Sequence, residues 1–179
     1  ASGVLTVFES TLRTDCALEA MGAMKDAVPE ALIGAGTVTN ADRMRQAKDC
    51  GADFVVSPGT TQALWNASVE YQLPILPGFS SASEAMALME GGSQCGKFFP
   101  AEASGGVNYL KSLAGPWPDF LVCPTGGIKA ETAGNYLACP NVICVGGSWI
   151  ASGDLLAQGD YAEIEVRARH ASLAQPLKS

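Results

Sequence analysis

The sequence predicts an α/β fold in which parallel strands alternate with helices, and three observations lead to this class. Short apolar runs recur along the chain, and each is followed by a stretch with helical periodicity. These runs are continuous rather than alternating, as in strands that are covered on both faces. No linker, low-complexity tract or charge run interrupts the 179 residues, so we expect a single domain over residues 1–179. A (β/α) barrel and a doubly wound sheet both fit this pattern.

The apolar runs and the helical stretches give the expected elements. Strands are expected at residues 4–8, 31–33, 54–56, 75–76, 97–99, 120–123 and 142–145. Helices are expected at residues 16–27, 41–49, 61–70, 82–90, 106–113, 130–137 and after Ser152, including 161–173. Thr39 and Ser81 each precede an acidic residue by three positions. This spacing predicts a capping box at the start of two helices.

Composition excludes several classes of partner. Eleven basic residues face 18 acidic ones, and the net charge of −7 argues against nucleic acid as the main partner. No apolar run approaches the ~20 residues of a membrane-spanning helix, and no secretion signal is visible. The six cysteines form no C-x-x-C pair, which favours a reducing, cytoplasmic location. His170 is the one histidine, so a His-rich metal site is impossible and no metal is expected.

In a parallel fold of this kind, functional groups collect where the strands end. Lys97 lies in a strand that continues into two phenylalanines. Burial there would disfavour the ammonium form, and a neutral amine can form a Schiff base with a carbonyl substrate. The alternative is a stem packed on the aromatic rings with its amine in solvent. Glu9 and Arg13 lie at the end of the first strand. Glu9 could act as a general acid–base and Arg13 could bind a substrate carboxylate; the alternative is an ordinary surface ion pair between them.

Two glycine pairs follow the last two expected strands. Gly126-Gly127 and Gly146-Gly147 stand where barrels of this class often bind a phosphate through backbone N–H groups. The alternative is that these glycines only form turns. The segment 34–39 begins like a dinucleotide-binding fingerprint but lacks its third glycine, so that interpretation is weak.

Seven segments resemble, in the same order, those of the 2-keto-3-deoxy-6-phosphogluconate (KDPG) aldolases. They are residues 11–14 (TLRT), 34–38 (GAGTV), 57–59 (SPG), 97–102 (KFFPAE), 105–106 (GG), 123–127 (CPTGG) and 146–149 (GGSW). The resemblance extends from Ser2 to Ala174. This family includes bifunctional enzymes that also cleave 4-hydroxy-2-oxoglutarate (KHG). The related phosphogalactonate aldolases usually differ in residues 97–102 and 123–127, so the gluconate type is favoured.

The resemblance implies a class I aldolase of the Entner–Doudoroff pathway that works without a cofactor. Lys97 resembles the Schiff-base lysine, and Glu9 resembles the general acid–base. The products would be pyruvate and glyceraldehyde 3-phosphate, or pyruvate and glyoxylate from KHG. Substrate-binding positions are matched by Arg13 and Thr37 for the carboxylate, Pro58 and Phe99 for the pyruvyl pocket, and Thr125, Gly126, Gly127, Gly147 and Ser148 for the phosphate and sugar hydroxyls.

The resemblance also implies a (β/α)8 TIM barrel, of which this chain lacks the first strand–helix unit. That unit is about 30 residues long. A homotrimer in the cytoplasm is expected by the same comparison. Two alternatives stay open, namely a non-catalytic phosphosugar-binding barrel and an aldolase for another 2-keto acid, such as the galactonate epimer.

Overall fold

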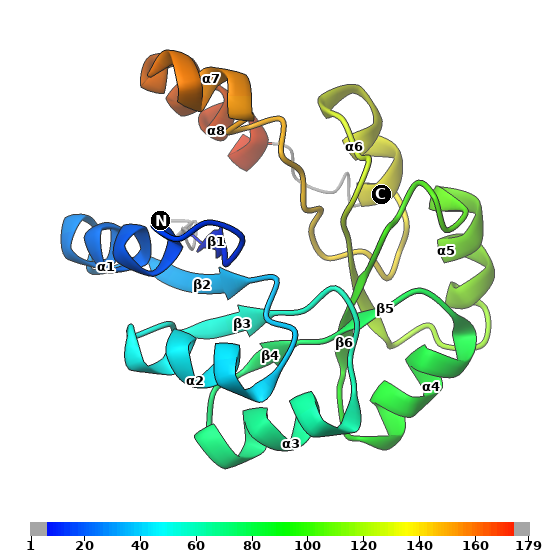
Figure 1. Ribbon diagram of the computed structural model, residues 1–179. Coiled ribbons are helices and arrows are strands. Elements are labelled where there is room, and N and C mark those ends of the chain that lie inside the picture. Colours follow the sequence, from blue (N-terminus) through cyan, green and yellow to red (C-terminus); the bar gives the residue numbers. More distant parts are fainter. Residues whose placement is uncertain (1–6, 174–179) are drawn as a thin grey trace. The chain divides into compact units, whose positions relative to one another are not determined.

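A computed structural model describes residues 7–173 of the chain (Figure 1). The chain divides into two compact units, Ala1–Phe79 and Ser80–Ser179, and each is considered by itself. Residues 4–6 of the first expected strand lie outside the described residues. The expectation of a single domain over 1–179 stays a prediction.

The first unit contains a parallel sheet with strand order β1-β2-β3-β4. The strands are β1 (Val7–Thr11), β2 (Leu32–Gly36), β3 (Phe54–Val56) and β4 (Ile75–Leu76), and the two-residue β5 (Gly78–Phe79) ends the unit. The helices between them are α1 (Ala17–Ala27), α2 (Ala41–Asp49) and α3 (Gln62–Tyr71). The predicted alternation of strand and helix is therefore confirmed for this part of the chain, within a few residues at each boundary.

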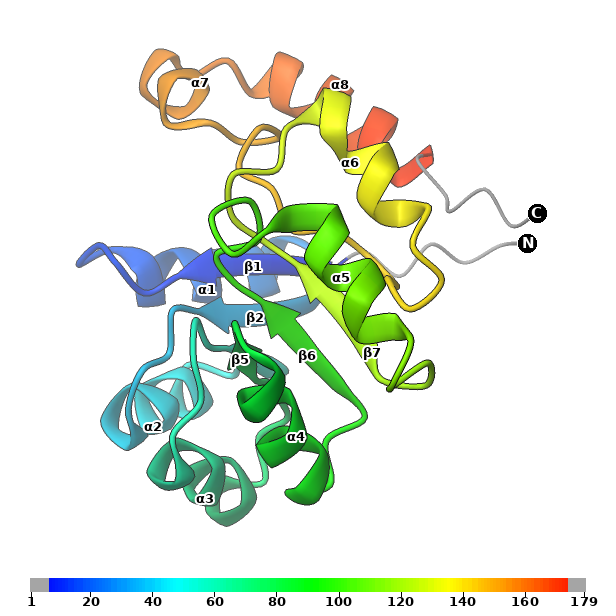
Figure 2. The same cartoon turned by 90° about the vertical axis from the view of Figure 1, so that its right-hand side faces the viewer.

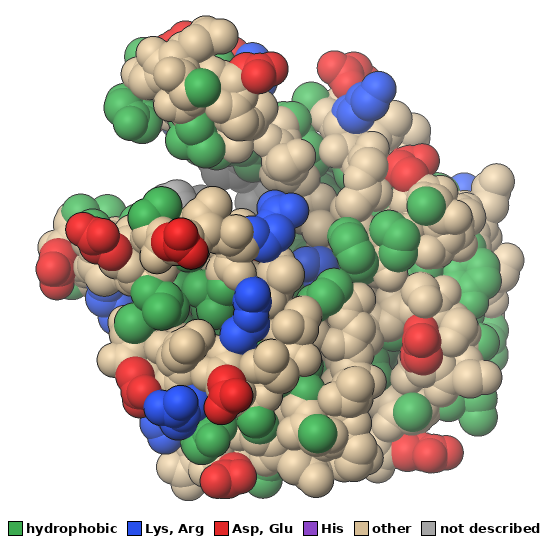
Figure 3. Space-filling model, in the orientation of Figure 1, with side chains coloured by type: hydrophobic (Ala, Val, Ile, Leu, Met, Phe, Trp, Pro, Cys, Tyr) green, Lys and Arg blue, Asp and Glu red, His purple; other side chains and the backbone are tan. Residues whose placement is uncertain are grey.

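Apolar side chains at helical spacing hold the first unit together. Met21 from α1, Met44 from α2 and Leu64 from α3 are almost fully buried in one core with Ile33 and Val55 from the sheet. Each such side chain contributes about 1.5–3 kcal/mol when it is removed from water. The opposite faces of the helices are polar, and acidic and basic side chains are interspersed around α2 and α3 (Figure 3).

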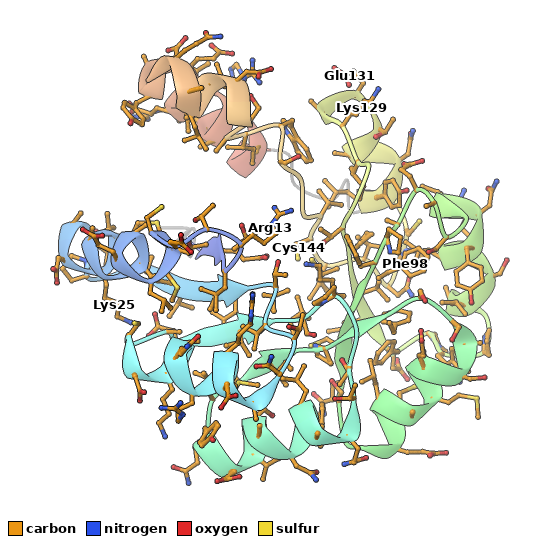
Figure 4. The ribbon with its side chains drawn as sticks, viewed as in Figure 1. Arg13, Lys25, Phe98, Lys129, Glu131 and Cys144 are labelled. Atoms are coloured by element: carbon orange, nitrogen blue, oxygen red, sulfur yellow. The ribbon has the colours of Figure 1, made fainter. Side chains whose placement is uncertain are left out.

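The second unit contains a parallel pair, β6 (Cys95–Phe98) and β7 (Leu121–Pro124), in which Lys97 is the register partner of Cys123 (Figure 2). Its helices are α4 (Ala82–Glu90), α5 (Gly106–Ala114), α6 (Ala130–Leu137), α7 (Gly153–Gln158) and α8 (Tyr161–Leu173). Phe98 points toward α5 and stacks on Tyr109 with ring centroids 5.4 Å apart (Figure 4). Within residues 7–173, no helix combines the length and apolarity needed to cross a membrane.

The expectation of a regular strand at residues 142–145 is wrong. This segment runs beside β7 but forms only two isolated parallel bridges with it, Val122 with Val142 and Thr125 with Gly146. Ile143 N donates to Val122 O (3.1 Å) and Gly146 N donates to Pro124 O (2.9 Å). Between these bonds a regular ladder needs an N–H at position 124, and proline has none. The apolar pattern located the segment correctly, but Pro124 interrupts its pairing.

The two predicted capping boxes have different outcomes. Ser81 caps α4, since its hydroxyl accepts from Glu84 N (3.3 Å) and the Glu84 carboxylate accepts from Ser81 N (3.0 Å). The prediction for Thr39 is wrong, because Asn40 caps α2 by accepting from Arg43 N at 2.9 Å. Asparagine is as good a cap as threonine or better, so the helix begins one residue later.

Candidate active site

Lys97 is a buried lysine on β6. Only 6% of the residue is exposed, and Nζ lies 5.4 Å from the centroid of the Phe99 ring. This geometry is a cation–π contact when the amine carries a proton. The predicted burial of Lys97 is confirmed, and the alternative with the amine in bulk solvent is wrong. Its role in catalysis is a separate question, which burial alone does not answer.

The loop after β6 is hydrogen-bonded to the loop after β7. Thr125 N donates to Phe98 O (2.9 Å), Ala101 N donates to Thr125 O (2.8 Å) and Glu102 N donates to Gly126 O (3.1 Å). These bonds continue the strand pairing beyond the strand ends. Gly126 has φ +103°, and a Cβ there would lie 3.1 Å from the ring of Phe99. Only glycine allows this close approach, so the ring beside Lys97 is positioned by the loop after β7.

The two glycine pairs singled out in the sequence follow neighbouring segments of the second unit. Thr125 is bridged to Gly146, where a Cβ would collide with the Thr125 hydroxyl. Gly127 has φ +79°, and a Cβ there would lie 2.8 Å from the side chain of Glu102. The structure therefore brings Phe99, Thr125 and both glycine pairs to one end of the parallel strands, as the strand-end argument predicted.

In this group, the N–H groups at four positions make no hydrogen bond to another described residue of the chain. The four are Gly126, Gly127, Gly147 and Ser148. Gly127 and Ser148 are exposed, and Gly126 and Gly147 are half-buried. Peptide N–H groups in this state can donate to a bound anion.

Glu102, the last residue of the KFFPAE segment, is held by a side chain from α6. The hydroxyl of Tyr136 donates to Glu102 Oε1 at 2.7 Å. Burial, with this hydrogen bond to a carboxylate, raises the pKa of Tyr136. The bond fixes the turn that follows Phe99, because Tyr136 itself is only 1% exposed.

The other predicted site residues belong to the first unit. Glu9 lies on β1, and its carboxyl group extends across Gly36 on β2, where a Cβ would collide with it. Arg13 follows the end of β1 and is exposed. Pro58 follows β3 and its backbone lies against Gly78, where a Cβ would collide with it.

Thr37 has a left-handed backbone conformation, with φ +60°. This region is costly for a β-branched residue and marks positions that the surrounding structure holds in place. The holding group is Arg43 on α2, whose Nη1 donates to Thr37 O (3.4 Å) and to Leu12 O. Arg43 thus joins the loop that carries Arg13 to the loop that carries Thr37. Sequence reasoning missed Arg43, since no motif identifies an arginine that binds carbonyls.

Among residues 7–173, no group of three or more histidine, cysteine, aspartate or glutamate side chains is arranged to hold a metal ion. The hydrogen-bond donors near Lys97 and the strand ends include its amine, the Thr125 hydroxyl and peptide N–H groups, and the Glu102 carboxylate at the same end is bonded to Tyr136. These donors suit an oxygen-rich organic anion, since they donate hydrogen bonds and, in the case of the amine, can attack a carbonyl carbon.

Comparison with known proteins identifies the class of this α/β protein: it is an aldolase, a carbon–carbon lyase. The model of the aldolase family described as KDPG and KHG aldolase matches residues 1–167, and the chain therefore belongs to that family. The resemblance seen in the sequence is confirmed.

Relatives and solved structures agree with this assignment. The KHG/KDPG aldolase of Escherichia coli (strain K12) is 46% identical over 170 residues, which are 95% of this chain and 80% of the relative. The KDPG aldolase of Legionella pneumophila, with pyruvate captured at low pH as a covalent carbinolamine intermediate, has 39% identity and a TM-score of 0.89 over 92% of this chain and 80% of its own. The enzyme of Zymomonas mobilis ZM4 with 3-phosphoglycerate has 43% identity and a TM-score of 0.90 over 97% and 81%. The predicted α/β fold class is confirmed by these structures.

Proposed function

We propose that this chain is a class I aldolase that cleaves KDPG to pyruvate and glyceraldehyde 3-phosphate through a Schiff base on Lys97. The observation that carries the proposal is the burial of Lys97 beside the Phe99 ring, at the end of a parallel strand. A buried amine is a functional candidate, since lysine is rarely buried without a purpose. Capture of pyruvate as a carbinolamine in the Legionella relative supports the same chemistry, because a carbinolamine is the adduct that precedes an iminium.

The reaction begins when the Lys97 amine attacks the C2 carbonyl of KDPG. The carbinolamine loses water and becomes an iminium, which accepts the electron pair of the C3–C4 bond once the C4 hydroxyl loses its proton. Glyceraldehyde 3-phosphate leaves, the remaining enamine is protonated at C3, and water releases pyruvate from Lys97. We assign the proton transfers to Glu9, whose carboxylate can act as base and then as acid.

Two groups of residues are assigned to binding. The guanidinium of Arg13 and the hydroxyl of Thr37 would bind the substrate carboxylate, for which the planar fork of arginine is well suited. The donors in the second unit would bind the phosphate and the sugar hydroxyls: the Thr125 and Ser148 hydroxyls with the N–H groups of Gly126, Gly127 and Gly147. Within residues 7–173 these N–H groups have no hydrogen-bond partner, which supports the assignment. Pro58 and Phe99 would enclose the pyruvyl group.

Cleavage of KHG to pyruvate and glyoxylate is a second activity of the same site. The family description and the name of the Escherichia coli relative both include KHG, which supports this addition. Both substrates carry a 2-keto carboxylate, so the Lys97 chemistry would be the same. We further propose a homotrimer in the cytoplasm, and sedimentation velocity would test the oligomeric state.

Borohydride reduction in the presence of pyruvate tests the proposal. Borohydride reduces an iminium to a stable secondary amine, and we expect one pyruvyl adduct on Lys97. Trypsin normally cleaves after Lys97, so the adduct should join residues 49–97 to residues 98–111 in one peptide. Lys97→Met should lose both the adduct and KDPG turnover, since methionine keeps the apolar stem without the nucleophile.

Lys129→Met is the matched control. Lys129 is an exposed lysine at the start of α6 (Figure 4), and this variant should keep the adduct and the activity. The absence of any adduct in the intact protein would favour a phosphosugar-binding barrel without catalysis. If kcat/KM is higher for the galactonate epimer than for KDPG, the epimer is the substrate and the proposed mechanism is unchanged.

A further inference from the structure

Cys123 and Cys144 come from adjacent parallel segments of the second unit. Cys123 on β7 is buried, at 8% exposure, whereas Cys144 in the segment beside β7 is exposed (Figure 4). All six cysteines are free thiols. Each of the two thiols shifts the pKa of the other, so their side chains lie close together. None of these cysteines has a part in the aldolase chemistry assigned above.

The interrupted ladder explains how these two thiols meet. Between the two bridges, β7 advances three positions, from Val122 to Thr125, whereas its partner advances four, from Val142 to Gly146. The partner therefore carries one extra residue, as in a β-bulge. Ile143 is 49% exposed, and Cys144 lies between the two bridges that also flank Cys123. Adjacent strands lie about 4.8 Å apart, and this spacing falls within the Cα–Cα range that a disulfide spans.

The two thiols differ in acidity. A hydrogen bond from Cys123 lowers the pKa of Cys144, against a smaller opposing effect of burial. The pKa of Cys123 is raised well above its usual value by that hydrogen bond, by burial and by the charge of Cys144, while Thr125 and Lys97 act in the opposite direction. Cys144 is thus the exposed thiol with more thiolate character, and its neighbour retains a proton.

We propose that Cys123 and Cys144 form a redox-active dithiol that a hydroperoxide converts to a reversible disulfide. The Cys144 thiolate attacks one oxygen of hydrogen peroxide. The S–O bond forms, the O–O bond breaks, and the departing hydroxide takes up a proton as water. Cys123 sulfur then attacks the sulfenic sulfur, the S–S bond forms and the S–O bond breaks, and the second hydroxide leaves as water with the Cys123 proton. Two thiols and one peroxide yield one disulfide and two waters.

Oxidation of Cys144 also prepares Cys123 for the second step. Two of the three effects that raise the pKa of Cys123 come from Cys144, namely the hydrogen bond and the negative charge. Both are lost when the Cys144 thiolate becomes a neutral sulfenic acid. The influence of Lys97, the register partner of Cys123, is retained and favours the attacking thiolate.

Peptide mapping of the oxidised protein tests the proposal independently of aldolase activity. The reduced protein is treated with equimolar hydrogen peroxide, blocked with N-ethylmaleimide and digested with trypsin without reductant. Trypsin separates Cys123 from Cys144 at Lys129 but leaves Cys139 and Cys144 in one peptide, so Cys139→Ser is the background. We expect residues 112–129 joined to 130–167, with the loss of two hydrogens, and restoration of both peptides by dithiothreitol.

Variants define the order of the two steps. Cys144→Ser should abolish the cross-link, and Cys123→Ser should leave a sulfenic acid that dimedone traps on Cys144. Cys16→Ser is the matched control, because Cys16 is also exposed but its thiol lies 3.5 Å from the Thr14 hydroxyl rather than beside a second thiol. This control should retain the cross-link. Circular dichroism should show native folding in each variant, and Cys144→Ala replaces Cys144→Ser if the latter unfolds.

Three results would overturn the proposal. The first is oxidation of Cys16 before any cross-link appears between Cys123 and Cys144. The second is a disulfide between Cys144 and Cys95, whose pKa is raised by burial and by the charge of Cys144. The third is a dimedone adduct that persists on Cys144 while Cys123 is present and reduced.

Discussion

The carboxyl group of Glu9 lies across Gly36 on the neighbouring strand, so closely that position 36 has no room for a side chain. A Cβ on Gly36 would lie 2.7 Å from Cδ and 2.8 Å from Cγ of Glu9 and would collide with Oε1. In the parallel register of β1 and β2, Glu9 is paired with Gly34 and Gly36 with Thr11, so the Glu9 side chain reaches diagonally along β2 to Gly36. The lack of a side chain at Gly36 therefore determines where the Glu9 carboxyl group lies.

Glu9→Gln should lower kcat for KDPG by about 10²- to 10⁴-fold, the usual contribution of a positioned general acid–base. KM should change little, because the amide keeps the shape of the side chain while losing its capacity to transfer a proton. Steady-state kinetics with coupled detection of pyruvate measures both constants. An unchanged kcat would remove Glu9 from the mechanism.

Gly36→Ala should lower kcat although residue 36 has no functional group. The added methyl group must displace the Glu9 carboxyl, and we expect a loss of about tenfold or more, with an unfolding cost of about 1–3 kcal/mol from overpacking. Gly22→Ala in α1 is the control, since nothing lies within 4 Å of a Cβ there. It should leave kcat unchanged and stabilise the protein by about 0.5–1 kcal/mol. Wild-type turnover in Gly36→Ala would show that the placement of Glu9 does not matter.

Arg13→Lys should raise KM for both KDPG and KHG, because both substrates carry the 2-keto carboxylate assigned to this residue. Replacing the two-pronged guanidinium by an ammonium loses about 1.5–3 kcal/mol of charged hydrogen bonding, or roughly 10- to 100-fold in affinity. Competitive inhibition by pyruvate gives the same comparison without turnover. An effect confined to KDPG would place Arg13 at the phosphate instead.

Ser148→Ala should raise KM for KDPG by about tenfold and leave KM for KHG unchanged, since only KDPG carries a phosphate for the Ser148 hydroxyl to bind. Ser112→Ala on α5 is the control, because that exposed hydroxyl donates to Asn108 O of its own helix at 3.0 Å. It should alter neither KM. Equal losses on both substrates in Ser148→Ala would contradict the phosphate assignment.

Asp53→Asn should reduce the free energy of unfolding by about 1 kcal/mol near neutral pH. Asp53 accepts from Lys25 Nζ (2.5 Å) and Ile33 N (2.8 Å). The hydrogen bond from Lys25, then that from Ile33, lower the pKa of Asp53 below its ordinary 3.8. A carboxylate whose pKa falls on folding adds its full share to the free energy of unfolding at pH values above its unfolded-state pKa. That share is lost as the pH falls through its folded-state pKa. The deficit of the variant should therefore shrink below about pH 3.8 in urea unfolding curves, whereas Asp26→Asn should cost little at any pH.

The sequence predicted the elements well where the signal is local. Apolar runs placed β2, β3 and β6 within three residues, and serine with glutamate three positions later identified the cap of α4. Burial of Lys97 followed from its aromatic neighbours. These features depend on nearest neighbours along the chain, which a sequence displays directly.

Features that depend on distant partners could not be predicted in this way. Pro124 breaks a ladder with residues about 20 positions away, and the pairing of Cys123 with Cys144 depends on the resulting bulge. Arg43 acts on the carbonyls of Leu12 and Thr37, which carry no side-chain signal. Only a three-dimensional arrangement reveals such contacts.

The three backbone hydrogen bonds between the loops after β6 and β7 couple the surroundings of Lys97 to the glycine-rich turn. An anion bound to the N–H groups of that turn, as proposed, would contact the peptides that also bond to the loop carrying Phe99. If the phosphate binds there as proposed, its binding would also hold Phe99 more firmly beside Lys97. With a substrate that lacks the phosphate, the Lys97 amine would be held less firmly. We would then expect a lower kcat for such substrates than for KDPG.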